Sequence, residues 1–175
     1  RLRRLHDGKL DPTPISGLPP VLATGQGGLL DVSLHPDFAD NGLVYLTLAI
    51  GSRDANRTAL ARGRLDGEAL RDTRIIFENA DPKSDGQHFG SRLVWLPDKS
   101  LLISLGDGGN PPISFKGDFI RNQAQNLGTH FGKILRLNDD GTPHPGNPFA
   151  GRAGARPEIW TLGHRNIQGL TRDPV

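Results

Sequence analysis

Short apolar runs separated by turn-forming residues recur along the whole chain, and almost none of them shows a helical period. Leu43–Ile50 is a continuous apolar run, typical of a buried strand, whereas Ala59–Leu65 alternates polar and apolar residues. Similar strand patterns occupy the remaining apolar segments: Leu29–Leu34, Thr73–Phe77, Leu93–Leu96, Leu101–Leu105, Lys133–Leu137 and Glu158–Leu162. A weak helical turn is expected at Asn122–Leu127. The pattern predicts an all-β fold.

The turns add an internal repeat to this picture. Pro36 and Pro97 lie 61 residues apart, and each opens a turn that leads into an apolar strand. A unit of this size, built from antiparallel strands, suits one blade of a β-propeller, although two ordinary hairpins in a β-sandwich would give a similar pattern. Three such units fill the chain, while a propeller closes with about four to eight blades. We therefore expect residues 1–175 to form a single domain, an incomplete ring of about three blades.

Composition narrows the function classes. The 23 glycines and 14 prolines fit a fold with many turns, and the net charge of only +2 argues against a nucleic-acid partner. The one basic cluster, Arg1, Arg3 and Arg4, is interpreted as a solvated chain end. Cysteine is absent, which excludes disulfides and thiolate metal sites. No apolar run reaches transmembrane length, so we expect no membrane insertion.

The first candidate site is a histidine and a carboxylate on either side of a predicted hairpin. His88 and Asp107 are 19 residues apart, and the Pro97–Ser100 turn lies near the midpoint. A hairpin folded at that turn brings both side chains to one end of the sheet. A carboxylate that orients a histidine gives a plausible general base. A turn-capping aspartate beside a solvated histidine is the competing interpretation.

Amide and guanidinium side chains mark two further loops. Gln26 sits at the corresponding end of the preceding hairpin, in a glycine-rich stretch that lets a ligand approach the backbone. Arg165, Asn166 and Gln168 follow the last predicted strand, which suits recognition of carboxylates or carbonyls. A purely structural arginine that satisfies loop carbonyls is the alternative. If blades are arranged radially, these loops share one face with His88.

Other motifs carry less information. His130 and His144 have no partner at metal-ligand spacing, and Asp139–Gly141 lacks the alternating ligands of a calcium loop, so a hairpin turn is expected there. No phosphate-binding loop, nucleophile elbow or dinucleotide fingerprint is present. We predict no metal ligands within this chain.

Four segments in order carry a family resemblance: GQGGLLDVSLHPDFADNGLVYLTL, HFGSRLVWLPDKSLLISLGDGG, AQNLGTHFGKILRLNDDGTPHPGNPF and ARPEIWTLGHRNIQGL. Together they closely resemble the soluble PQQ-dependent aldose sugar dehydrogenases of the glucose/sorbosone dehydrogenase family. The resemblance implies a six-bladed β-propeller that binds pyrroloquinoline quinone (PQQ) over its central channel and oxidises aldoses to lactones.

The resemblance also assigns roles by motif. His88 corresponds to the general base, Asp107 to the carboxylate that orients it, and Gln26 to a residue that contacts the quinone. Arg165 and Asn166 correspond to the pair near the reactive quinone carbonyl, where Arg165 stabilises developing negative charge. The reduced quinone then passes its electrons to an external acceptor.

The resemblance covers roughly half of the family's length. It implies that the calcium ligands and the basic residues for the PQQ carboxylates lie beyond Val175, so this chain is expected to be an inactive fragment with a periplasmic or secreted parent. Exposed strand edges are expected to favour association. Two other functions remain open: a non-catalytic propeller that binds a partner on its rim, and a metal-dependent sugar lactonase-like propeller.

Overall fold

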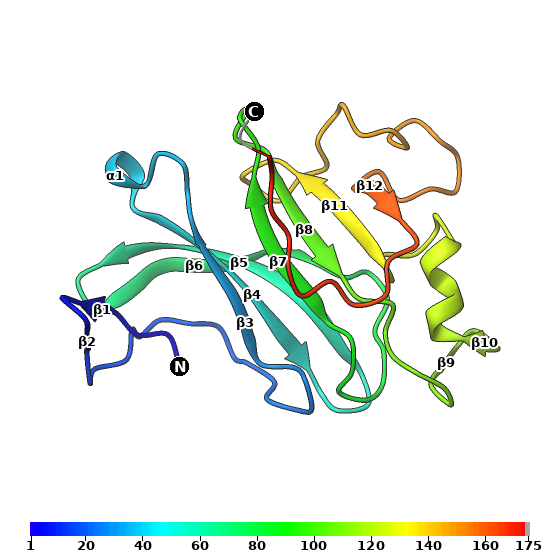
Figure 1. The fold of residues 1–175 in the computed structure, drawn as a ribbon, viewed down its shortest axis with the longest axis horizontal. Coiled ribbons are helices and arrows are strands. Elements are labelled where there is room, and N and C mark those ends of the chain that lie inside the picture. Colours follow the sequence, from blue (N-terminus) through cyan, green and yellow to red (C-terminus); the bar gives the residue numbers. More distant parts are fainter. Residues whose placement is uncertain (174–175) are drawn as a thin grey trace.

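The computed structural model describes residues 1–173 as two four-stranded antiparallel sheets that lie side by side (Figure 1). The strands of the first sheet follow chain order: β3 (Leu29–Leu34), β4 (Leu43–Gly51), β5 (Asn56–Asp66) and β6 (Ala69–Glu78). The second sheet has the order β12-β11-β8-β7, with these bounds: β7 (Gly90–Trp95), β8 (Leu101–Leu105), β11 (Lys133–Leu137) and β12 (Ile159–Leu162).

Smaller elements lie outside the two sheets. Two hairpins of two-residue strands are formed by β1 (Leu5–His6) with β2 (Lys9–Leu10) and by β9 (Ser114–Phe115) with β10 (Asp118–Phe119). The helical turn expected at Asn122–Leu127 is a 3-10 helix, η1 (Ile120–Gln125). The turn before β4 contains a single helical turn, α1 (Phe38–Asn41), which ends at Gly42 in the left-handed conformation.

The all-β prediction is confirmed, and every predicted strand is present, four of the eight being longer than predicted. The number of repeated units differs from the expectation of about three. Within residues 1–173 there are two four-stranded sheets and no closed ring. The reason is that β11 pairs with β8 in register from Lys133↔Leu105 to Leu137↔Leu101, so the last strands complete the second sheet instead of starting a third.

The apolar run of strand β4 is continuous because both of its faces are buried. Tyr45 faces the second sheet and packs with Leu60, Leu101 and Ile103, all fully buried. Leu46, on the opposite face, belongs to a separate cluster that also takes in Ile15 of the N-terminal segment. Because both faces of β4 are covered, polar alternation is lost. Each buried leucine or isoleucine contributes about 1.5–3 kcal/mol relative to an exposed one.

The registers place four loops at one end of the two sheets. Leu29 of β3 pairs with Leu48 near the end of β4, while Gly90 pairs with Leu105, so β7 begins where β8 ends. The segments before β3, between β6 and β7, after β8 and after β12 therefore start or end at one rim. The first two of these loops lie along the lower edge of Figure 1. The turn with α1 and the turn at 96–100 lie at the opposite rim.

Strands β3, β6, β7 and β12 are sheet edges. On β3, Val32 and Leu34 are 48% and 50% exposed. Association through such edges stays a prediction. No helix among residues 1–173 is long and apolar enough to cross a bilayer.

Candidate active site

The β7–β8 hairpin brings His88 and Asp107 together, as their spacing predicted. His88 lies two residues before β7 and Asp107 two residues after β8, at positions that continue the Gly90↔Leu105 pairing. The imidazole Nδ1 and the carboxylate Oδ1 are 2.7 Å apart, and the side chains are only 5% and 6% exposed. The alternative of a solvated histidine is therefore wrong.

The hydrogen bonds of Asp107 fix the chemistry of the pair. Its Oδ1 accepts a hydrogen bond from the Gly109 backbone N–H at 3.1 Å as well as from His88 Nδ1. A carboxylate acceptor places the imidazole proton on Nδ1, which leaves the lone pair on Nε2. No residue in the described part of the chain hydrogen-bonds that Nε2 atom. The arrangement fixes the tautomer of His88 and leaves Nε2 able to accept a proton.

The backbone around His88 is tightly constrained. His88 has φ +47°, in the left-handed region, and its carbonyl packs against Gly106, where an added Cβ would lie 2.0 Å from the oxygen. The strand register is interrupted between Gly90 and Leu93. Side chains of the first sheet take over the lost pairing: Thr58 donates to the Phe89 carbonyl at 3.1 Å, and Thr47 to the Ser91 carbonyl at 2.8 Å.

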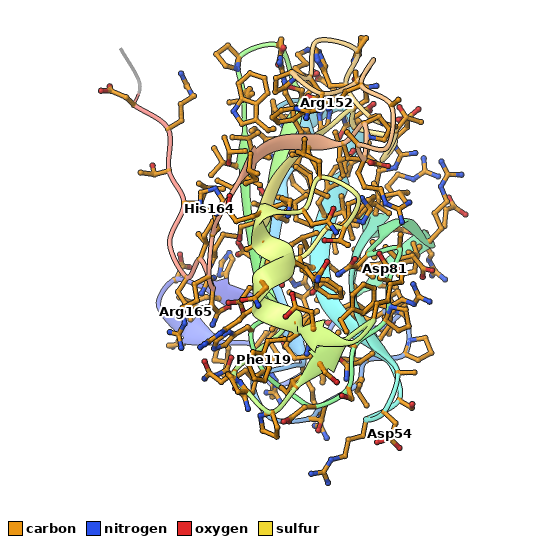
Figure 2. The ribbon with its side chains drawn as sticks, turned by 90° about the vertical axis from the view of Figure 1, so that its right-hand side faces the viewer. Asp54, Asp81, Phe119, Arg152, His164 and Arg165 are labelled. Carbon is orange, nitrogen blue, oxygen red and sulfur yellow. The ribbon has the colours of Figure 1, made fainter. Side chains whose placement is uncertain are left out.

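Arg165 lies beside His164 on the segment that follows β12 (Figure 2). Its backbone carbonyl accepts a hydrogen bond from the Asp107 N–H at 2.7 Å, which ties the two loops together. Its guanidinium is exposed and donates to Asn110 Oδ1 at 2.9 Å. The structural alternative, a guanidinium bonded to loop carbonyls, is not what the structure shows, because the Arg165 side chain bonds to another side chain.

Lys133 holds the segment that carries Arg165 through backbone hydrogen bonds. Its Nζ donates to the carbonyls of Gln123, Ala124 and Phe131 at 2.9, 3.0 and 2.6 Å, and the residue is fully buried. The Ala124 carbonyl also accepts the N–H of Gly163, two residues before Arg165. Burial lowers the pKa of Lys133 to about 8. The ammonium thus anchors η1 and the Arg165 segment to the start of β11.

Three amide side chains form a network beside His88. Gln26 Oε1 accepts hydrogen bonds from the His88 backbone N–H at 2.9 Å and from Asn166 Nδ2 at 3.5 Å. Asn166 Oδ1 accepts from Gly90 N–H and Gln168 Nε2, both at 3.0 Å. The network fixes which way the Gln26 amide points, because its oxygen accepts both hydrogen bonds. No hydrogen bond of its Nε2 is found within residues 1–173.

The network borders an open concavity of about 300 Å³ at this rim. Its walls combine the amides with an apolar and aromatic surface: Gln26, Leu30, Phe89, Gly90, Asn166 and Gln168. The concavity therefore offers both polar and apolar contacts.

Sequence reasoning missed Asn110 and Gln87. Asn110 holds the Arg165 guanidinium, and Gln87 Oε1 accepts from Asn110 Nδ2 at 3.3 Å. The Asn110–Arg165 contact joins residues 55 positions apart in two loops, and no local pattern announces such a contact.

His130 and His144, the two other histidines considered in the sequence, have structural surroundings. His130 is buried, accepts the Ala80 N–H on Nδ1 and lies 3.3 Å from Glu158 through Nε2. His144 lies 3.7 Å from Asp98 at the opposite rim. Across residues 1–173, no group of three or more potential metal ligands is found. The Asp139–Gly141 segment is the predicted hairpin turn, closed by a hydrogen bond from Asn138 N–H to the Thr142 carbonyl at 2.8 Å.

Comparison with known proteins identifies the family of this chain. A profile of the family described as "Glucose / Sorbosone dehydrogenase" matches residues 1–175. An uncharacterised Synechocystis protein is 56% identical over all of this chain and 44% of its own length. The aldose sugar dehydrogenase YliI of Escherichia coli is 40% identical over 99% of this chain and 45% of its own.

Solved structures agree with these sequence matches. The soluble aldose sugar dehydrogenase of Escherichia coli in its apo form superposes with a TM-score of 0.87 at 39% identity, over 98% of this chain and 48% of that one. The PQQ-bound aldose sugar dehydrogenase of Streptomyces coelicolor gives a TM-score of 0.73 at 33% identity, over 95% of this chain and 45% of that one. This chain spans a little under half the length of these relatives. It belongs to the glucose/sorbosone dehydrogenase family.

Proposed function

We propose that this chain supplies the catalytic rim of a sugar oxidoreductase that oxidises aldoses to lactones with PQQ. The observation that carries the proposal is the buried His88–Asp107 pair, 2.7 Å apart, on the rim that also holds Arg165 and the Gln26 amide. A surface that only binds a partner needs no buried, oriented base. Family membership supports sugar oxidation as the chemistry of this rim.

The donor set fits an ortho-quinone with carboxylate substituents. Gln26 Nε2, Asn166 and the exposed Arg165 guanidinium supply hydrogen-bond donors for carbonyl and carboxylate oxygens. Leu30, in the wall of the concavity, supplies an apolar surface for a flat ring system. A PQQ-bound structure in the family supports the same assignment. When bound, the quinone would supply a two-electron acceptor for the hydride from the sugar's C1.

The residues of this chain would handle the proton. His88 Nε2 takes the proton of the C1 hydroxyl, and Asp107 stabilises the imidazolium that forms. With the proton on His88 and the C1 hydride on the acceptor, the aldose has lost two electrons and two hydrogens and becomes the lactone. Arg165 stabilises negative charge that develops on the accepting side. Asn110 holds the guanidinium in place for this role.

Several parts of the proposal concern the complete protein. We propose that calcium and the remaining cofactor contacts come from blades outside this chain, that an external acceptor reoxidises the quinone, and that the protein works in the periplasm or is secreted. Residues 1–175 alone should then show no turnover.

The test is aldose-dependent dye reduction by the complete protein reconstituted with PQQ, with a quinone titration of each variant. His88→Ala should lower kcat by about 10³–10⁴, near the top of the range for loss of a general base. Its quinone affinity should stay near that of the wild type. His144→Ala, which removes a histidine beside an aspartate at the opposite rim, is the matched control and should keep full activity. Wild-type turnover in His88→Ala would refute the proposal.

A further inference from the structure

A buried lysine lies directly behind the segment that carries His88. Lys83 is only 6% exposed, and it stands between β6 and β7. Its Nζ lies 3.9 Å from the centroid of the Phe89 ring and donates to the Asp85 backbone carbonyl at 3.1 Å. These two contacts fall at the two ends of the Asp85–Phe89 segment. The ammonium therefore spans the five residues in which His88 sits.

The first sheet holds the same two ends. Asn56 Nδ2 donates to the Asp85 carbonyl at 2.8 Å, and Thr58 Oγ1 donates to the Phe89 carbonyl at 3.1 Å. Both residues are at the start of β5 and are buried. Lys83 itself exchanges two backbone hydrogen bonds with Asn56, at 2.8 and 2.9 Å. Asn56 and Thr58 each hold one end of the segment, whereas Lys83 contacts both.

Burying this ammonium opposes folding. Desolvation lowers the pKa of Lys83 to about 8, and the neighbouring charge of Asp85 only partly offsets that effect. One carbonyl and one aromatic face replace the hydration of a group with three donors. A methionine of similar length would fill the same space without a charge. The lysine thus contributes a directed contact where an apolar residue would be at least as stable.

We propose that Lys83 is a positioning residue, whose ammonium fixes the Asp85–Phe89 segment and so holds the His88 imidazole against Asp107. The inference rests on the proposed function in one respect, namely that the orientation of His88 matters for catalysis. Lys83 acts through Phe89 and the Asp85 carbonyl, and it contacts neither sugar nor cofactor.

The experiment compares Lys83→Met, Lys83→Arg and a control in the complete protein. Lys116→Met is the control, because Lys116 also lies over an aromatic ring, 4.8 Å from the Phe115 centroid, but its side chain is 74% exposed. The primary measurement is the NMR solvent-exchange rate of the His88 Nδ1 proton, which requires neither sugar nor quinone. Urea unfolding and kcat are measured on the same samples.

Loss of a buried cation–π contact and its hydrogen bond should speed exchange of the His88 proton about tenfold in Lys83→Met. In the same variant the unfolding free energy should be unchanged or higher, and kcat should fall about tenfold with the sugar KM nearly constant. Lys83→Arg should restore the exchange rate and kcat of the wild type. Lys116→Met should match the wild type.

Two results would overturn the proposal. One is an exchange rate and kcat in Lys83→Met that equal those of Lys116→Met. The other is loss of the fold in Lys83→Met, which would make Lys83 part of the framework. Faster exchange in Lys83→Met together with full turnover in His88→Ala would leave the positioning role standing and remove the proposed function instead.

Discussion

Replacing Asp107 by asparagine tests the separate roles of the two residues in the His88–Asp107 pair. Asparagine keeps the size of the side chain and an oxygen that can accept from His88 Nδ1 and from Gly109 N–H, the two contacts that Asp107 Oδ1 makes. What the substitution removes is the negative charge beside an imidazole that becomes positive during proton transfer. The expected effect is therefore on the transition state and not on cofactor binding.

The geometry sets the size of this effect. Two unit charges about 4 Å apart interact by about 4 kcal/mol at an effective dielectric constant of about 20. Burial of both side chains makes solvent screening weak. If about half of the positive charge has developed on the imidazole at the transition state, the loss is about 2 kcal/mol, or roughly thirtyfold in kcat. This is smaller than the loss expected for His88→Ala, because the base is still present.

The assay is steady-state dye reduction with a saturating aldose, together with a quinone titration. Asp98→Asn is the matched control, since Asp98 lies beside a histidine at the opposite rim. Asp107→Asn should lower kcat roughly thirtyfold and leave quinone affinity unchanged, while Asp98→Asn should turn over like the wild type. A kcat for Asp107→Asn within twofold of the control would show that Asp107 does not stabilise the charged imidazole.

Three further outcomes follow from the same geometry. Arg165→Ala should lower both quinone affinity and kcat, because the guanidinium meets the cofactor before and during reaction; an unchanged titration would place Arg165 outside the site. Lys133 has a folded-state pKa of about 8 against 10.5 for the unfolded chain, so the unfolded state binds more protons between these values and unfolding free energy should rise with pH through that window. Urea titrations at the two ends of this pH window should show a smaller rise in unfolding free energy for Lys133→Met than for the wild type, and an unaltered rise would contradict the lowered pKa of Lys133. Gly106→Ala should cost about 1–3 kcal/mol of stability because the new methyl group would meet the His88 carbonyl, whereas Gly151→Ala, with open space around it, should be near neutral in the same urea titration; equal stabilities would contradict the predicted clash.

Local pattern was sufficient for the sheet and for the central pair. The Pro97–Ser100 turn between two apolar runs fixed the hairpin, and a hairpin necessarily returns Asp107 to the end where His88 departs. The continuous apolar run of β4 likewise predicted a strand buried on both faces. These features depend on residues close together in the sequence, where periodicity and turn chemistry act directly.

Contacts between loops could not be predicted from the sequence, and the reason is physical. Asn110 meets Arg165 and Gln26 meets Asn166 only after both sheets have formed and packed, and the latter pair is 140 residues apart. The burial of Lys83 could not be predicted either, because a lysine in a polar loop is ordinarily solvated. The number of sheets was misjudged because the pairing of β11 with β8 spans a long insertion that carries its own small hairpin.

The backbone hydrogen bond from Asp107 N–H to the Arg165 carbonyl also has a consequence for biosynthesis. The ribosome adds residues at about 5–20 per second, so Arg165 emerges several seconds after Asp107. The first sheet and the β7–β8 hairpin can pair in that interval, since their contacts are complete by residue 105. The β7–β8 hairpin can therefore bring His88 and Asp107 together before Arg165 has emerged to join them.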